Sequence, residues 1–421
     1  MVGLDLLGCF PLIASCAFFP PTHAWASKNA SAQKDDKRLS EISFQVHRTV
    51  QDVPASFWQP NALTNGVFVN PGYLSGLEKT VHPDKMQFFY VSLRNNQQPY
   101  ALFCFTKLSF GLRQVLNAVI GTARHSKAIP DFNWHFLICG NMMVSGAAGI
   151  AVANTNRSGR VAELIHQAAL MLNRELKLNA ACILVKDLPP ALLDSDIFAS
   201  RGYREVEAAP VMTLTIRPRW HSFNDYLASL NSKYRTTINK YRASVAILEK
   251  RELDASGIKQ YAGEIDRLYH TVYSKAPYKG PFLGHGYFLA LREQLNREQF
   301  QVIGYFRDQA LLAFNSRMMD QRVLYSSFFG YDDQAVKTYA LFKNMLLDDI
   351  QYAAEHGLDA VNFGRGTYEV KSAFGAEPQS FPLFIRPLKL FPKLFLPVIK
   401  AVLKPRRWTP RRPFKNPRQS S

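Results

Sequence analysis

Charged side chains gather in one short stretch of the chain, residues 361–378. An apolar run ends at Gly364, and Arg365, Glu369 and Lys371 follow within seven residues. A glycine after a strand lets the backbone approach a ligand closely, and open α/β sheets hold their ligands at strand ends. A lysine there can stabilise an oxyanion, a carboxylate can accept a proton, and an arginine can bind a carboxylate or phosphate through two hydrogen bonds. The alternative is a polar turn and a short helix whose charges face water.

Three further residues are candidates for contact with a substrate. Tyr331 and Asp332 end a predicted central strand, where we expect them to border a cleft. His285 lies between two glycines in a predicted flexible loop. No Ser-His-Asp or Cys-His combination has the sequence context of a covalent hydrolase, and no histidine or cysteine spacing predicts a metal site.

A basic amphipathic helix is predicted within residues 222–250. Lys233 and Lys240 lie on one side of its apolar stripe, and Arg235 and Arg242 lie on the other. Lys233 and Arg235 are therefore candidates for binding a phosphate-bearing substrate. The alternative is a helix whose charges are simply solvated.

The elements that would position these residues occur in two similar series of strands, one helix and further strands. Alternating or continuous apolar runs indicate the strands, and apolar spacings of three and four residues indicate the helices. The first series covers residues 88–93, 100–107, 136–139, 161–176 (the helix), 181–185 and 211–216. The second covers residues 300–306, 310–318, 322–329, 338–356 (the helix), 359–363 and 381–386. This repetition predicts two copies of one α/β unit.

The composition is that of a globular protein with a basic C-terminal tail. The 421 residues are 47% hydrophobic and 20% charged, and they carry a formal net charge of +18. Residues 378–421 contain eleven lysines and arginines and no acidic residue, so they supply most of that excess. We expect the tail, residues 388–421, to contact an anionic membrane face. Nucleic-acid binding and a solvated, disordered tail are the alternatives.

The first 40 residues are predicted to be a dispensable leader. Their apolar run at residues 6–19 is preceded by Asp5 rather than by a basic residue and is interrupted by Pro11. A cleaved signal peptide is therefore the less favoured interpretation. The five cysteines are widely spaced in apolar surroundings, which favours buried, reduced thiols and a cytoplasmic location.

Several short motifs resemble those of the Fem-like, tandem-GNAT N-acyltransferases, a group that includes predicted peptidoglycan-biosynthesis proteins. The motifs are Ser232-Lys-Tyr-Arg235, Phe329-Gly-Tyr-Asp332, Gly364-Arg365 with Lys371, Phe374-Gly-Ala376, Cys139-Gly-Asn141 and Lys186-Asp187. The resemblance spans residues 88–386. It implies an α/β fold of two tandem GNAT-like domains, each with a mixed, largely antiparallel central sheet flanked by helices. The implied division is residues 41–220 for the first domain, 221–252 for the connecting helix and 253–387 for the second, catalytic domain.

The resemblance also implies roles for the candidate residues. Lys371 matches the lysine that stabilises charge on the transferred acyl group, and Glu369 would act as a general base or orient that lysine. Arg365, Tyr331, Asp332, Lys233, Arg235 and His285 would bind substrate. The acceptor is expected to be the amine of a small molecule, such as a cell-envelope precursor, bound in or near the cleft between the domains.

The resemblance implies a co-substrate but no tightly bound cofactor, and it leaves two donors open. Acyl-CoA enzymes carry a glycine loop that binds pyrophosphate before the central helix, and residues 333–338 contain no glycine. Some relatives that use aminoacyl-tRNA carry a long helical-hairpin arm, and residues 231–250 are too short for one. The rival interpretation is a non-catalytic module that binds anionic membrane or nucleic acid through its basic helix and tail.

Overall fold

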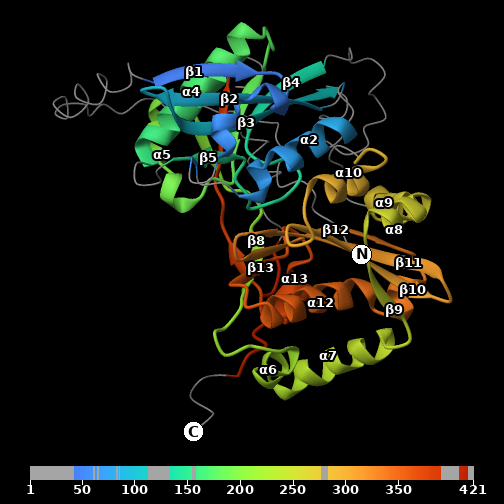
Figure 1. The fold of residues 1–421 in the computed structure, drawn as a ribbon. Coiled ribbons are helices and arrows are strands. Elements are labelled where there is room, and N and C mark those ends of the chain that lie inside the picture. The colour runs from blue at the N-terminus through green and yellow to red at the C-terminus, as the bar shows by residue number, and fades with distance from the viewer. Residues whose placement is uncertain are drawn as a thin grey trace, which may run out of the picture.

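Two β-sheets, separated and flanked by helices, make up the body of the protein (Figure 1). The computed structural model describes residues 42–59, 62–63, 66–81, 84, 86–111, 133–153, 158–275, 283–389 and 407–415. The leader, Cys9 and Cys16, and most of the basic tail lie outside these residues. Within them, Cys104, Cys139 and Cys182 are free and buried, as predicted, and no helix is long and apolar enough to cross a membrane.

The first sheet has eight strands in the described residues, in the order β1-β2-β3-β4-β6-β15-β7, with β5 paired to β3. Its strands are β1 (Ile42–His47), β2 (Met86–Asn95), β3 (Gln98–Gly111), β4 (Asn133–Cys139), β5 (Ile150–Val152), β6 (Cys182–Lys186), β7 (Arg204–Val206) and β15 (Leu383–Pro387). The β4–β6 pair is parallel, and the other pairs are antiparallel. A tight hairpin turn joins β2 to β3, and its two residues, Asn96 and Gln97, have positive φ angles.

The second sheet has seven strands in the described residues, in the order β14-β8-β13-β12-β11-β10-β9. Its strands are β8 (Val211–Thr215), β9 (Glu249–Leu253), β10 (Phe300–Arg307), β11 (Ala310–Asp320), β12 (Val323–Tyr331), β13 (Ala360–Asn362) and β14 (Glu377–Gln379). Only the β12–β13 pair among these strands is parallel. Strand order and pairing directions match those of the first sheet, which confirms the predicted duplication and the mixed, largely antiparallel sheets.

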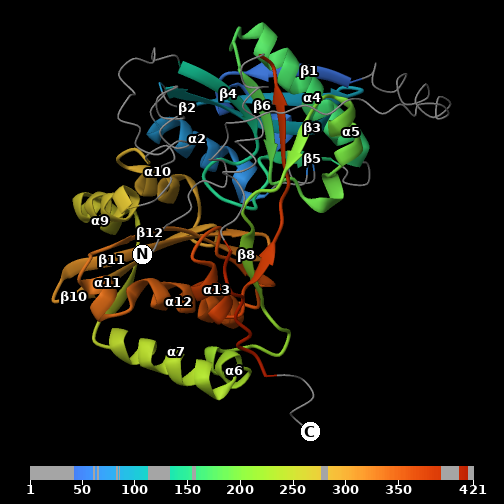
Figure 2. The same ribbon diagram turned by 180° about the vertical axis from the view of Figure 1, so that it is seen from behind.

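The two halves of the chain exchange one strand each. β8 follows the first half in sequence but lies in the second sheet, between β13 and β14. β15 follows the second half but lies in the first sheet, between β6 and β7. Figure 2 shows both crossings, with β8 in green and the red strand rising into the upper sheet. The sequence pattern placed each strand with the repeat that precedes it, and the observed pairing reverses both assignments.

Helices cover the outer faces of both sheets and fill the space between them (Figure 1). The helices are α2 (Pro71–Thr80), α4 (Ser158–Glu175), α5 (Ser195–Ser200), α6 (Phe223–Ala228), α7 (Ser232–Val245), α8 (Ala255–Gln260), α9 (Ala262–Lys275), α10 (Tyr287–Gln294), α11 (Ala335–Thr338), α12 (Leu341–Glu355) and α13 (Tyr368–Ala373). α4 and α5 pack on the first sheet, and α12 packs on the second with α6 and α7 beyond it. The predicted helices at 161–176 and 338–356 are thus confirmed as α4 and α12.

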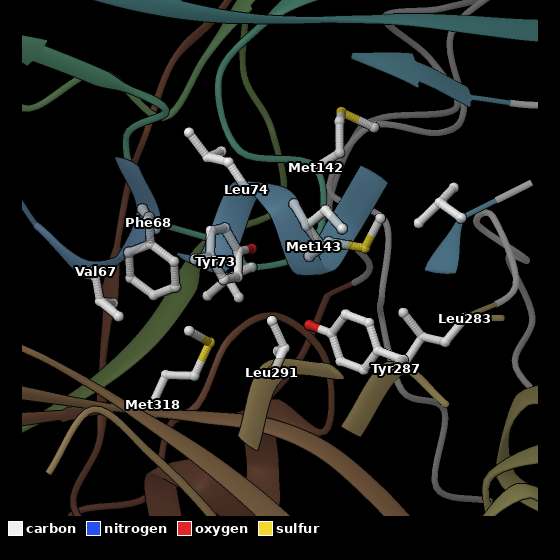
Figure 3. Close-up of a cluster of buried hydrophobic side chains, with 14 of the residues drawn as sticks. Val67, Phe68, Tyr73, Leu74, Met142, Met143, Leu283, Tyr287, Leu291 and Met318 are labelled. Atoms are coloured by element: carbon white, nitrogen blue, oxygen red, sulfur yellow. The ribbon is translucent and has the colours of Figure 1, made fainter. Parts of the chain in front are cut away.

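A shared apolar core joins the two halves between the sheets. Figure 3 shows Tyr73 of α2 on the side of Leu291 and Tyr287 of α10, with Met143 and Met318 beside them, while Leu74 points to the opposite side of α2. The N-terminus of α2 is well defined. The Asn70 side chain accepts a hydrogen bond from Gly72 N at 2.8 Å, and Pro71 occupies the first helical position. The halves are therefore held against each other, and residues from both can form one site.

Candidate active site between the two sheets

A pocket opens where the two parallel strands of the second sheet separate. β12 and β13 pair only from Val323 to Tyr325, although β12 continues to Tyr331. An irregularity in the β11–β12 pairing follows directly, where Asn315 pairs with Phe329 and Arg317 with Ser326. The pocket is lined by Met143, Val144, Ser145, Ser326, Ser327, Phe329, Phe342, Asn362, Phe363, Gly364, Arg365, Thr367 and Lys371. Both halves of the chain thus contribute to it.

Lys371 borders this pocket from the short helix α13. Its side chain is buried, and Nζ donates to the carbonyl oxygen of Arg365 at 2.7 Å and to that of Gly364 at 3.3 Å. These carbonyls are available because the chain leaves β13 through Gly364 and Gly366, both with positive φ angles. The turn after β13 therefore fixes the direction of the ammonium group.

Arg365 joins the second half to the first through a buried ion pair. Its Nη2 donates to Asp187 Oδ1 at 2.8 Å, and its Nε donates to the carbonyl oxygen of Ala209 at 2.6 Å. The Arg365 and Asp187 side chains are each 1% exposed. Asp187 also accepts from Lys186 Nζ and, at 3.1 Å, from the backbone nitrogen of Gly146. The carboxylate thus connects the ends of β6 and β13.

The electrostatics of this cluster favour an anionic ligand. Burial alone would raise the pKa of Asp187, but the Arg365 guanidinium and the Lys186 ammonium hold it well below its ordinary value. Lys186, Arg365 and Lys371 are all buried, and Asp187 is the carboxylate that pairs with the first two. A developing negative charge beside Lys371 would therefore lie in a positive, water-poor environment.

A loop of the first half closes one wall of the pocket. Asn362, the last residue of β13, donates to the carbonyl oxygen of Ser145 at 3.1 Å. Gly146 has a φ angle of +77°, and a Cβ atom there would lie 2.9 Å from Asn362 Nδ2. The glycine-rich loop at residues 145–149 is therefore a contact between the two halves of the chain, and it requires glycine at position 146.

A larger cleft lies on the other side of this wall. Its empty volume, with its open mouth included, is about 1,040 Å³, against about 520 Å³ for the first pocket. Gly146 and Asp187 line it, together with Asp320 and Tyr325 of the second half. Asp320 accepts a hydrogen bond from Val67 N at 2.8 Å, and burial raises the pKa of its carboxyl group. The two cavities thus approach each other across a thin wall of loop and strand.

A buried carboxylate lies behind one wall of the first pocket. Ser326 lines the pocket, and its hydroxyl donates to Asp349 Oδ2 at 2.5 Å. Asp349 also accepts from Asn315 Nδ2 at 2.9 Å, and Arg317 Nη1 lies 3.8 Å away. Complete burial raises the pKa of Asp349 to about 6, although Arg317 lowers it. Ser326 and Asp349 form a polar path from the pocket into the protein interior.

Of the residues predicted to form the site, the structure brings Arg365 and Lys371 together, but it does not bring Glu369 to them. Glu369 is exposed, and its carboxylate lies 3.6 Å from Arg411 of the tail. Successive helical residues are about 100° apart around the axis, so side chains two positions apart point to opposite sides. The expectation that Glu369 orients Lys371 is therefore corrected.

The other five predicted residues lie away from the described pocket lining. Tyr331 is buried at the far end of β12, and the Asp332 carboxylate accepts from the backbone nitrogens of Gln334 and Ala335 at the start of α11. His285 pairs with Asp266 of α9 at 2.5 Å, which raises the pKa of its exposed imidazole. Lys233 and Arg235 lie on α7, beyond α12.

Sequence reasoning gave no site role to Asp187, Ser326 or Asp349. The Lys186-Asp187 motif was a detectable signal, because it follows a buried strand as Gly364-Arg365 does. Its ion-pair partner is 178 residues away, so the pairing needed the structure. Ser326 and Asp349 carry no local pattern that separates them from ordinary strand and helix residues.

One protein-family model matches the part of the chain that forms the second sheet. A family model described as FemAB-like, peptidoglycan biosynthesis/recognition, matches residues 211–382. This segment begins at the first residue of β8 and ends directly before β15, so it contains every strand of the second sheet described above. We refer to residues 211–382, which are similar to this family, as the FemAB-like domain. Arg365, Lys371, Ser326 and Asp349 all belong to it.

Several solved structures are similar to most of this chain. The crystal structure of FemX is similar with a TM-score of 0.50 and 11% identity, over 81% of this chain and 96% of FemX. A tandem GNAT protein from the clavulanic acid biosynthesis pathway has a TM-score of 0.48 and 13% identity, over 83% of this chain and 99% of that protein. L-PGS from Bacillus licheniformis has a TM-score of 0.45 and 12% identity, over 80% of this chain and 97% of that protein.

No curated protein sequence matches the chain. The FemX likeness covers both sheets and therefore extends the fold assignment beyond the FemAB-like domain. The predicted tandem fold is confirmed by the two matching sheets and by the likeness to FemX, and the match of residues 211–382 supports the predicted resemblance to Fem-like N-acyltransferases.

Proposed function

We propose that the protein transfers an acyl or aminoacyl group to the amine of a cell-envelope precursor, in the pocket between its two sheets. The observation that carries this proposal is the Lys371 ammonium, buried and fixed by two carbonyl oxygens at the edge of a pocket that both halves line. The match of residues 211–382 to a peptidoglycan biosynthesis/recognition family supports the precursor as acceptor.

Lys371 would act on the charge that develops during transfer. When an amine attacks the carbonyl carbon of an acyl donor, the carbonyl oxygen gains negative charge, and a fixed cation in a water-poor pocket stabilises it. The cation does not have to reorganise, because its hydrogen bonds to Gly364 and Arg365 already hold it. The C–O or C–S bond of the donor then breaks, and the alcohol or thiol leaves.

Ser326 would accept the proton that the amine must lose. Its hydroxyl lines the pocket and already donates its hydrogen to Asp349. A proton taken from the attacking nitrogen can therefore pass to Ser326 as the serine hydrogen moves to the carboxylate. Asp349 is suited to this role near neutral pH because burial raises its pKa to about 6.

The amine of the acceptor would enter the first pocket beside Lys371 and Ser326, and another part of the acceptor would occupy the larger cleft beyond Gly146 and Asn362. Asp320 offers a partly buried carboxylate in this cleft for a cationic or hydrogen-donating group of the acceptor. The donor would be acyl-CoA or aminoacyl-tRNA, both cytoplasmic compounds that carry phosphate, and neither would be tightly bound. The net positive cluster beside the pocket favours such anionic donors.

A transfer assay with matched donors tests this function. The purified protein is incubated with a peptidoglycan precursor that bears a free amine and with either a panel of acyl-CoAs or a pool of aminoacyl-tRNAs. Mass spectrometry then follows the acceptor. We expect a mass gain of one acyl or aminoacyl group with one donor class. Absence of transfer from both, together with protection of the fold by anionic vesicles or nucleic acid, would favour the binding module instead.

A further inference from the structure

The described part of the C-terminal tail packs against the helix that carries Lys371. We call residues 407–415 the clasp; they appear as the short red segment beside α6 in Figure 2. The basic composition of the tail predicts contact with an anionic membrane, with nucleic-acid binding or a solvated, disordered tail as the alternatives. In the structure the clasp is bound to the FemAB-like domain on both of its sides, as the contacts below show.

On one side the clasp contacts α13 and the residues that flank it. The Trp408 ring stacks on Tyr368, the first residue of α13, with 5.4 Å between ring centroids and 27° between ring planes. Arg411 N donates to Ser372 Oγ at 3.2 Å, and Arg411 Nη2 lies 3.6 Å from Glu369. Ser372 directly follows Lys371, so the clasp is bonded to the residue next to the proposed catalytic group.

On the other side Phe414 anchors the clasp. Its ring lies beside Trp220 and Tyr226, with centroid separations of 5.5 and 6.4 Å, and the Arg217 guanidinium lies 4.1 Å from its centroid. Gly375, in the turn after α13, packs directly against this ring. A Cβ atom at Gly375 would lie 2.2 Å from Phe414 Cζ. The Phe414 ring therefore occupies space that a side chain at position 375 would fill.

Backbone hydrogen bonds fix the same anchor to the connection between α6 and α7. Asn231 N donates to the carbonyl oxygen of Pro413 at 2.8 Å, and Lys415 N donates to that of Ser229 at 3.0 Å. Asn231 Nδ2 donates to the carbonyl oxygen of Phe414 at 3.1 Å. Tyr226 of α6 in turn donates to the carbonyl oxygen of Phe374, just beyond α13, at 3.1 Å. The clasp, α6 and the end of α13 therefore form one connected unit.

α13 needs such support because it is too short to be stable alone. It has six residues, and it starts after Thr367, which has a φ angle of +48° and makes no side-chain capping bond. An isolated helix shorter than about 12 residues is marginal in water, so tertiary contacts must hold it. A small displacement of a catalytic group can cost about 100-fold in rate.

We propose that the clasp is a positioning element that keeps α13 in place and thereby keeps the Lys371 ammonium at the pocket. Trp408, Arg411 and Phe414 act through α13 and do not themselves touch the reacting groups. The effect on turnover rests on the function proposed above, whereas the effect on the order of α13 does not.

Truncation with peptide rescue tests the clasp. One variant ends at Arg406 and lacks it, and a matched control ends at Lys415 and keeps it. Amide hydrogen exchange of residues 367–376 is measured in both, and a synthetic peptide of residues 407–421 is added to the shorter one. We expect at least tenfold faster exchange without the clasp, reversed saturably by the peptide but not by a peptide with Phe414→Ala. Full-length Trp408→Ala and Phe414→Ala variants give the same comparison if the truncation does not fold, with the exposed Arg412→Ala as control.

Kinetics then separate positioning from simple stabilisation. In the active transferase, loss of the clasp should lower kcat by about 10- to 100-fold with little change in KM, and the peptide should restore it. Unchanged exchange in residues 367–376 would overturn the proposal whatever the activity. Faster exchange with unchanged kcat would leave the clasp a stabilising contact and would refute the positioning role. If no transfer activity exists, the exchange and rescue data still decide the structural claim.

Discussion

Replacing Asp187 by Asn should destabilise the protein far more than the same change in an exposed ion pair. The substitution keeps the shape of the side chain but removes the charge that neutralises Arg365 and Lys186. Both members of the Asp187–Arg365 pair are 1% exposed, so water cannot replace the lost carboxylate. Breaking a buried ion pair from one side typically costs about 3–5 kcal/mol, because the remaining charge stays buried. We expect an unfolding free-energy loss in this range.

The chain contains a matched control in an exposed ion pair of the same sheet that carries Arg365. Asp359 pairs with Arg322 at 2.9 Å, but these side chains are 61% and 65% exposed. Screening by water makes such pairs contribute little, so Asp359→Asn should shift the urea unfolding midpoint only slightly. The double variant Asp187→Asn/Arg365→Leu should recover part of the loss, because it also removes the uncompensated guanidinium.

The pH dependence gives a second measure of the same pair. The folded-state pKa of Asp187 lies below its ordinary value, so its ionised form stabilises the fold above the unfolded-state pKa of about 3.9. The difference in unfolding free energy between wild type and Asp187→Asn should be largest at neutral pH and should shrink as the pH falls below about 4. Urea unfolding, followed by circular dichroism at several pH values, measures both the size of the stability loss and its pH dependence. A shift in Asp187→Asn no larger than that in Asp359→Asn would refute the buried-pair reasoning.

Three further substitutions test the first pocket and its surroundings. Asp349→Asn should remove an acidic limb near pH 6 from the rate profile, while Ser326→Ala should lower kcat by about 10²–10⁴-fold; an unchanged profile in both would exclude the proton path. Because the folded-state pKa of Asp349 is raised, the unfolding free energy of the wild type should fall by on the order of 3 kcal/mol as the pH rises from about 4 to about 6. Asp349→Asn should not show this fall. Urea titrations at both pH values measure it. Gly146→Val should cost about 1–3 kcal/mol through its positive φ angle and should lower transfer by pushing Asn362 aside, whereas wild-type activity would show that this wall is not critical.

Local sequence patterns predicted most of the elements but not their exchange between sheets. The apolar spacing within residues 161–176 and 338–356 sufficed for α4 and α12, because helix periodicity is a property of neighbouring residues. The positions of β8 and β15 depend on pairing between residues far apart in the sequence, such as Thr213 with Glu377 and Phe384 with Val185. Short apolar strands carry no information about which sheet they join, so this part of the topology was out of reach.

The candidate site was predictable where it follows strand ends and not where it depends on distant partners. Gly364, Arg365 and Lys371 come directly after a buried strand, which is why the sequence pointed to them. Glu369 was misplaced because proximity in sequence was given more weight than its position on the opposite side of α13. Asp187 and Asp349 acquire their roles through burial and through partners in other elements, and neither burial nor those partners can be read from neighbouring residues.

The Lys371→Met variant addresses the proposed catalysis most directly. Methionine keeps the length and most of the packing volume of lysine but cannot place a positive charge beside the pocket. Transfer to the precursor amine should fall by about 10²–10³-fold, with wild-type circular dichroism and unchanged donor binding. Lys371→Arg, which keeps a charge in a different shape, should retain more activity than Lys371→Met. Wild-type transfer by a folded Lys371→Met protein would contradict the assignment of Lys371 as the group that stabilises the transferred acyl oxygen.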